Sequence, residues 1–255
     1  LTLQPFGGIE PARAADEVEI NATNFPDEKF RSYVTENFDT DKDGILSTEE
    51  IAAVTKIDVS KVNVITDMTG VQVFTELQTL NCAGQALKAL DVTKLEKIQV
   101  IDASKNQLQS FILPKSAPDL WEVDIDTNQI TELTSLSEFG NLQILDVGSN
   151  NLTTLELNLL SKLTNLDVSG NALTTLDLSA NSKLEEVSCY NMTALPELDL
   201  ATTATVDHTS LKKVSGGFYS EHGRGSLTKV DVSGDKGLTE LELTGNSVSS
   251  LNIKG

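Results

Sequence analysis

Short apolar segments recur along most of the chain at a nearly constant interval. In each copy, two apolar residues three apart are followed by a third two residues later. The copies begin at Leu77, Ile98, Leu120, Leu142, Leu163, Leu184, Leu211 and Leu238. The first six are 21 or 22 residues apart, and the last two follow at intervals of 27. Each copy predicts a strand with an inward apolar side, and burial of that side requires the copies to stack into a solenoid.

An asparagine stands eight residues after the start of five copies. These residues are Asn106, Asn128, Asn150, Asn171 and Asn246. An asparagine amide donates and accepts, so it can bond the backbone groups exposed where the chain leaves a strand. The full pattern is the leucine-rich-repeat spacing. A degenerate copy at Val54 precedes the first regular one, and we expect a solenoid of about eight coils over residues 56–255.

Each coil also contains a second apolar segment about ten residues after the first, as at residues 87–92 and 173–178. Two strand-like segments in so short a coil leave no room for a helix on the back. The predicted fold class is therefore mainly β, a leucine-rich-repeat solenoid with short strands on both faces. A short 3₁₀ turn on the back is the alternative.

Residues 39–50 read DTDKDGILSTEE and match the calcium-binding loop of an EF-hand. Calcium prefers six to eight oxygen ligands, and Gly44 suits the sharp turn in the middle of such a loop. The expected ligands are Asp39, Asp41, Asp43, the carbonyl of Ile45, Ser47 directly or through water, and Glu50. An acidic turn between two helices without metal is the alternative.

Helical patterns flank this loop. Phe30, Val34 and Phe38 recur every four residues and predict a helix opened by Pro26. After the loop, Ser47 and Glu50 have the spacing of a capping box, which competes with calcium for the Glu50 carboxylate.

These helical patterns predict a small EF-hand-like cap over residues 20–55 that covers the open end of the solenoid core. We therefore expect calcium to raise thermal stability without changing the overall shape. Residues 1–19 have no regular period and are interpreted as a tether or the remnant of an export signal.

The stretch INATNFPDEKFRSYVTENFDTDKDGILSTEEI, followed by VTKIDVS and coils of the LDVS type, resembles the exported leucine-rich-repeat proteins of gut and oral bacteria. The resemblance extends over about residues 20–255. It implies a secreted or surface-attached protein that acts in adhesion or protein binding. The two 27-residue intervals depart from the regularity of that family.

The formal net charge of −19 disfavours nucleic acid and anionic membranes as partners, since both would repel the chain. No apolar run approaches the ~20 residues that span a bilayer, so no transmembrane segment is expected.

Cys82 and Cys189 occupy the third apolar position of copies five coils apart. Five strand spacings amount to roughly 24 Å, and a disulfide needs Cα atoms within about 7 Å. Both cysteines are therefore expected to be buried, free thiols. His208 and His222 lie in the inserted segments and are expected on the surface. No catalytic motif accompanies them, and we expect no enzyme.

Residues four places into each copy form an outward column across the predicted front face. The column is Asn81, Asp102, Asp124, Asp146, Asp167, Ser188, Ser215 and Glu242. A similar acidic set marks the back: Asp91, Glu156, Asp177, Asp199 and Asp231. Because both faces are acidic, solubility of the strand surfaces is the simplest explanation. Aromatic residues favour a partner-binding site at Trp121, Glu122, Asp124, Asp126, Tyr190, Phe218 and Tyr219.

The sequence thus favours a non-enzymatic, secreted or cell-surface protein that binds a protein or glycan ligand and holds a structural calcium ion. The alternative is a spacer or matrix scaffold stabilised by calcium. A binding protein should concentrate aromatic residues on one face, whereas a spacer should not.

Overall fold

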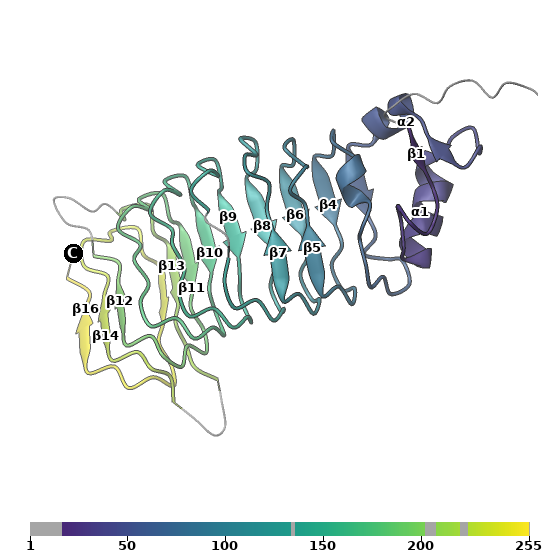
Figure 1. Cartoon of the computed structure of the whole chain (residues 1–255). Coiled ribbons are helices and arrows are strands. Elements are labelled where there is room, and N and C mark those ends of the chain that lie inside the picture. Colours follow the sequence, from purple (N-terminus) through teal and green to yellow (C-terminus); the bar gives the residue numbers. More distant parts are fainter. Residues whose placement is uncertain (1–16, 134–135, 202–207, 220–223, 255) are drawn as a thin grey trace, which may run out of the picture.

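The computed structural model describes residues 17–133, 136–201, 208–219 and 224–254. Most of the predicted tether, and His222, lie outside these ranges. In the described part, stacked coils of short strands follow a small cap with two helices (Figure 1). The elements of the cap are β1 (Val18–Glu19), α1 (Glu28–Phe38), β2 (Ile45–Leu46) and α2 (Thr48–Ala53). The predicted fold class, mainly β with strands on both faces, is confirmed.

One face of the solenoid carries a parallel sheet, here called the front sheet, that contains nine of the described strands. In order across the sheet they are β3 (Lys56–Asp58), β4 (Thr79–Asn81), β6 (Val100–Asp102), β8 (Glu122–Asp124), β9 (Ile144–Asp146), β10 (Asn165–Asp167), β11 (Glu186–Ser188), β13 (Lys213–Ser215) and β15 (Glu240–Glu242). Strand β3 comes from the degenerate copy and pairs with β4, with Ile57 opposite Leu80.

Two smaller sheets form the back. Their strands are β5 (Ala89–Asp91) and β7 (Ser110–Ile112) in one sheet, and β12 (Glu197–Asp199), β14 (Lys229–Asp231) and β16 (Ser250–Asn252) in the other. The described back segments of the coils between these sheets run without strand pairing. A 3₁₀ turn, η1 (Val71–Val73), covers the back of the first coil, so both predicted backbone forms occur.

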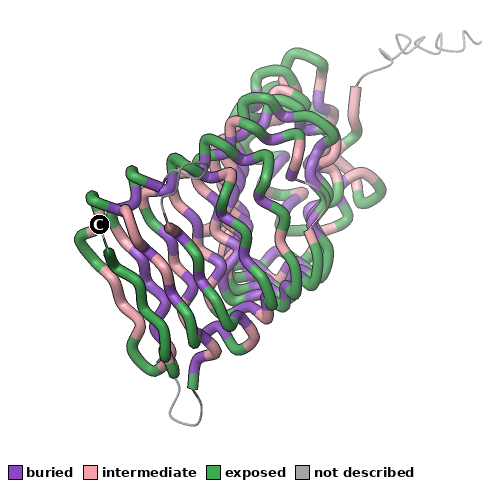
Figure 2. Tube along the Cα trace, turned by 90° about the vertical axis from the view of Figure 1, so that its left-hand side faces the viewer, coloured by how far each residue is buried: buried purple, intermediate pink, exposed green. Residues whose placement is uncertain are grey.

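The apolar positions of the motif are buried between the two faces in the copies that begin at Leu77 to Leu211, and half-buried in the last copy, which begins at Leu238. Figure 2 shows the resulting alternation of buried and exposed residues along the coils. The asparagines complete this core. Asn150 is a typical case: its Nδ2 donates to the carbonyls of Ile125, Val147 and Gly148 at 2.9–3.1 Å, and its Oδ1 accepts from Ile130 N at 3.0 Å. The asparagine amide thus bonds backbone groups where the chain leaves a strand, as predicted, and it does so in two successive coils.

The cap packs directly on the first coil. Phe74 lies at the end of η1, with its ring centroid 6.4 Å from Phe25 and 5.2 Å from Phe38. Helix α1 begins at Glu28 rather than at Pro26, because Asp27 is the N-cap and accepts from the amides of Lys29 and Phe30. The other oxygen of Asp27 accepts from the amide and hydroxyl of Thr66, which joins the helix start to the solenoid.

No helix in the described residues is both long enough and apolar enough to cross a membrane.

Candidate functional site

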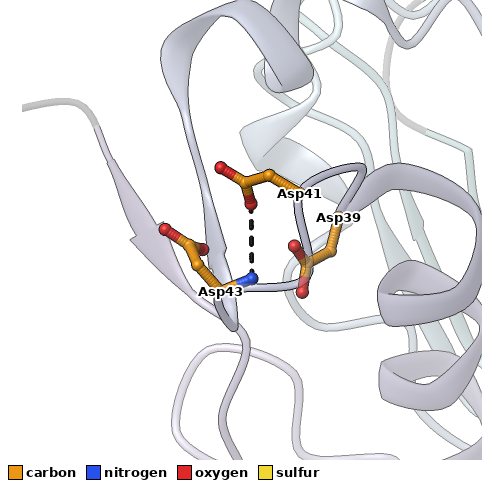
Figure 3. Close-up of side chains that lie close together, drawn as sticks. All are labelled: Asp39, Asp41 and Asp43. Carbon is orange, nitrogen blue, oxygen red and sulfur yellow. Dashed lines mark hydrogen bonds between the residues drawn. The ribbon is translucent and has the colours of Figure 1, made fainter.

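The predicted calcium loop brings three aspartates together between α1 and α2. One carboxylate oxygen from each of Asp39, Asp41 and Asp43 lies within 4.8 Å of the others (Figure 3). The turn depends on left-handed backbone at Lys42 (φ 63°) and Gly44 (φ 83°). These conformations fold residues 39–43 back on themselves, so that the three side chains share one side of the loop.

The arrangement of Asp39 fits a cation. Its side chain is 5% exposed, and Oδ2 accepts from Gly44 N at 3.1 Å, whereas Oδ1 has no hydrogen-bond partner. A buried carboxylate oxygen without a partner is costly unless something compensates its charge. Asp41 and Asp43 each accept one backbone amide within the loop, which leaves further lone pairs on both side chains.

Glu50 and Ser47, the last two predicted ligands, are bonded to protein groups. Glu50 Oε2 accepts from Ser47 N and Oγ, both at 2.9 Å, which completes the predicted capping box with α2. Its Oε1 accepts from Thr40 N and Oγ1, both at 2.6 Å. Burial acts to raise the pKa of Glu50, but these hydrogen bonds from Thr40 and Ser47 outweigh it and lower the value to about 2. In this structure the Glu50 carboxylate therefore serves the capping box of helix α2.

A second group of carboxylates crosses the front sheet. The acidic column consists of Asp102, Asp124, Asp146 and Asp167, which lie opposite one another on adjacent strands. Each one accepts the amide two residues later in an Asx turn, as in the 2.9 Å bond from Gly148 N to Asp146. Aspartate therefore has a structural role at this position, because it closes the turn that ends each strand.

These carboxylates are half-buried and repel one another. Burial, with added repulsion from neighbouring carboxylates, outweighs the Asx-turn bond and raises the pKa of Asp124 to about 6 and that of Asp146 to about 7. Burial also raises the pKa of Asp167 and of Glu122, which is next to Asp102. The negative charge of this column is thus poorly compensated by the protein itself.

The corresponding residues of the back face behave differently. The back column consists of Asp91, Asp177, Asp199 and Asp231, each with the same Asx turn. Asp91 faces Ile112 across its sheet, and only Asp199 and Asp231 face each other directly. Hydrogen bonds from Ser179 lower the pKa of Asp177, and similar bonds outweigh burial to lower it for Asp91 and Asp231. Front and back therefore share composition but differ in electrostatics.

Two of the four predicted aromatic residues, Tyr190 and Tyr219, meet at the C-terminal part of the front sheet. The aromatic corner consists of Tyr190, Tyr219 and Glu242. The two tyrosine rings have centroids 5.5 Å apart, and both hydroxyls donate to Glu242, that of Tyr190 at 3.4 Å. Tyr219 is 57% exposed, whereas Tyr190 is half-buried. Sequence reasoning placed Glu242 in the column, four residues after Leu238, but not its bonds to the tyrosines.

The other predicted contact residues are not part of this corner. Trp121 is half-buried and precedes β8, three strands away from β11. Asp124 belongs to the acidic column, and Glu122 and Asp126 share its side of the chain, as predicted, because all three are half-buried and alternate with the buried Val123 and Ile125. Phe218 is half-buried, and its backbone amide bonds to Thr244 O at 2.7 Å.

The cysteines and His208 offer no accessible reactive group. Cys82 and Cys189 are buried free thiols, as predicted, and burial raises the pKa of Cys189 to about 12. The prediction that His208 lies on the surface is wrong: it is 1% exposed, and its ring nitrogens lie 2.9 Å from Leu178 O and Leu200 O. The ring lies between backbone carbonyls of two successive coils and is occupied in a structural contact.

The comparisons with known proteins agree with this architecture. Residues 141–163 match the family model described as Leucine Rich Repeat. No curated protein matches the sequence significantly.

Solved structures of Listeria monocytogenes proteins share the fold. The functional domain of InlJ, which includes a cysteine ladder, aligns with a TM-score of 0.53 at 20% identity over 94% of this chain and 72% of its own. An internalin, InlF, gives a TM-score of 0.59 at 20% identity over 92% and 77%. Internalin C2 gives 0.56 at 18% identity over 87% of this chain and 100% of its own. Identities this low show the fold alone.

Proposed function

We propose that this leucine-rich-repeat protein is a non-enzymatic bacterial binding protein, secreted or held at the cell surface, whose front sheet recognises a protein ligand. The fold it shares with internalins suits protein binding or adhesion. A solenoid presents a long surface built from many coils, and solenoid proteins use such extended surfaces to bind partners.

The observation that carries the proposal is the aromatic corner beside the acidic column. Tyr219 is among the most exposed large hydrophobic residues of the described part, and its ring contacts Tyr190 at a tilt rather than packing into the core. Tyrosines in this setting commonly supply the strongest contacts of a protein interface. The back column has no comparable aromatic pair among the described residues.

The test is a screen of the purified chain against an array of extracellular proteins and glycans. A matched variant carries Tyr190→Ala and Tyr219→Ala, and a control carries Leu159→Ala, an exposed residue away from the front strands. We expect a protein ligand that the tyrosine variant loses and the control retains. Binding to glycans alone would show that the ligand is a glycan and not a protein. An array with no bound partner would favour the spacer function instead.

We further propose that the cap holds a structural calcium ion. The support is the unpartnered, buried Oδ1 of Asp39 beside Asp41 and Asp43. When bound, the ion supplies the positive charge that this cluster lacks. The carbonyl of Ile45 follows in the loop, and Ser47 and Glu50 can join only by giving up the hydrogen bonds between them.

Calcium in this loop stabilises the cap on the first coil through binding linkage. At a calcium concentration about 100 times the dissociation constant, linkage adds ~2.7 kcal/mol, or about 5–10 °C in melting temperature for a chain of this size. Asp39→Asn keeps an oxygen for Gly44 N but removes the charge, and should abolish the calcium effect. A melting temperature of the wild-type chain that is the same in calcium and in chelator would contradict the proposal.

A further inference from the structure

The acidic column stands on a part of the front sheet that has no cationic side chain of its own. Strands β6 to β11 of this sheet carry six carboxylates and no lysine or arginine. The carboxylates are Asp102, Glu122, Asp124, Asp146, Asp167 and Glu186. The next strand, β13, has Lys213, but that lysine is paired with Glu240 at 3.2 Å. Nothing on these strands neutralises the column.

The aromatic corner continues this surface toward the C-terminus. Ser215, on β13, lies opposite Ser188 of β11 on one side and opposite Glu242 of β15 on the other. Its side chain is fully buried, and its hydroxyl has no hydrogen-bond partner among the described residues. The corner therefore combines an exposed tyrosine face with a carboxylate that both tyrosine hydroxyls approach, and the unsatisfied hydroxyl of Ser215 belongs to the residue opposite that carboxylate. Aromatic faces next to carboxylates attract lysine and arginine side chains.

We propose that the front sheet binds a cationic, extended segment of a protein partner, with one lysine or arginine seated on Tyr219 beside Glu242 and further cations along the acidic column. This inference rests on the proposed function and names the chemistry of its ligand. Cations would relieve the repulsion between carboxylates that face one another on neighbouring strands, which lie about 4.8 Å apart in a sheet.

The back column offers a matched control for this inference. A front variant replaces each aspartate of the acidic column by asparagine, and a back variant does the same to each aspartate of the back column. Each variant removes four negative charges, so that the formal net charge changes from −19 to −15 in both. Asparagine keeps the oxygen that accepts the Asx-turn amide at every one of these eight positions. Folding is therefore expected to survive in both.

The probe is a synthetic peptide of alternating lysine and threonine with blocked ends, titrated by calorimetry at low and at physiological salt. A peptide with glutamine in place of lysine tests the charge of the ligand. We expect the front variant to weaken binding about tenfold and the back variant less than about twofold, since several partly exposed ion pairs are lost only on the front. Tyr219→Ala alone should weaken binding about threefold.

Equal weakening in the front and back variants would show attraction by net charge alone and would overturn the inference. So would a wild-type chain that binds the lysine and glutamine peptides equally. Neither result affects the outcome of the protein screen described above. A ligand that the tyrosine variant loses but the front variant still binds would leave the proposed function intact and would refute the cationic ligand.

Discussion

Replacement of Asp146 by asparagine should stabilise the folded protein at neutral and alkaline pH. Asp146 lies in the middle of the acidic column, between Asp124 and Asp167 on adjacent strands. Asparagine has nearly the same shape, and its oxygen can still accept from Gly148 N, which is 2.9 Å away in the wild type. The substitution therefore removes charge while it keeps the Asx turn.

The magnitude follows from the pKa. Burial and the neighbouring carboxylates raise the pKa of Asp146 to about 7, whereas an aspartate in an unfolded chain has a pKa near 3.9. Each pH unit between these values corresponds to about 1.4 kcal/mol, which gives an upper limit of ~4 kcal/mol. Solvent reaches the half-buried carboxylate and its neighbours titrate with it, so we expect a gain of about 1–2 kcal/mol.

The raised pKa of Asp146 determines both the sign of its effect on stability and the pH range over which that effect changes. Because the folded chain binds more protons at Asp146 than the unfolded chain between about pH 4 and 7, this residue destabilises the wild type as pH rises through that window. The penalty is complete above about pH 7 and absent below about pH 4. The advantage of Asp146→Asn over the wild type should follow the same course.

Urea unfolding followed by the fluorescence of Trp121 measures this difference, with both proteins compared at pH 4, 5.5 and 8. Asp177→Asn is the matched control, because hydrogen bonds from Ser179 lower the pKa of Asp177. Loss of that charge should leave stability unchanged or lower at pH 8. Equal stability of wild type and Asp146→Asn at pH 8, or a gain of the same size at pH 4, would refute the reasoning.

Three further outcomes are expected. Asn150→Ala should lower the free energy of unfolding by about 2–4 kcal/mol in urea titrations, because it leaves buried backbone groups of two coils unbonded. Gly70→Ala should lower the melting temperature by several degrees, since its backbone has φ 100° and a Cβ would lie 2.4 Å from Asn24 O. Cys82 and Cys189 should react with a thiol reagent in denaturant but not in the folded protein, as absorbance assays can show.

Most of the repeat architecture could be read from the sequence. Side-chain orientation along a strand repeats every two residues, and the first six copies repeat every 21 or 22 residues, so a single register predicts which side chain points inward in those coils. The pairing of Asp124 with Asp146, and the bonds of Asn150 to two coils, follow from that register alone. Local repetition makes such contacts nearly as predictable as local structure.

The candidate sites were less accessible to sequence reasoning. The loop motif placed Asp39, Asp41 and Asp43 correctly as neighbours, but it left Glu50 open between capping and calcium. Hydrogen bonds from Thr40 and Ser47 decided this in favour of capping in the structure. The choice depends on how the two helices meet, and no single motif encodes that geometry.

The sequence by itself determined the coil, its inward leucines, its asparagine bonds and the buried cysteines, because each depends on a position within one repeat. Only the tertiary structure decided where the two inserted segments return to the solenoid. It buried His208 between the carbonyls of two coils and set Tyr219 against Tyr190 and Glu242. It also distinguished the two acidic faces. Both carry a column of aspartates, but burial and neighbouring carboxylates raise the pKa of Asp146 on the front, whereas hydrogen bonds from Ser179 lower the pKa of Asp177 on the back.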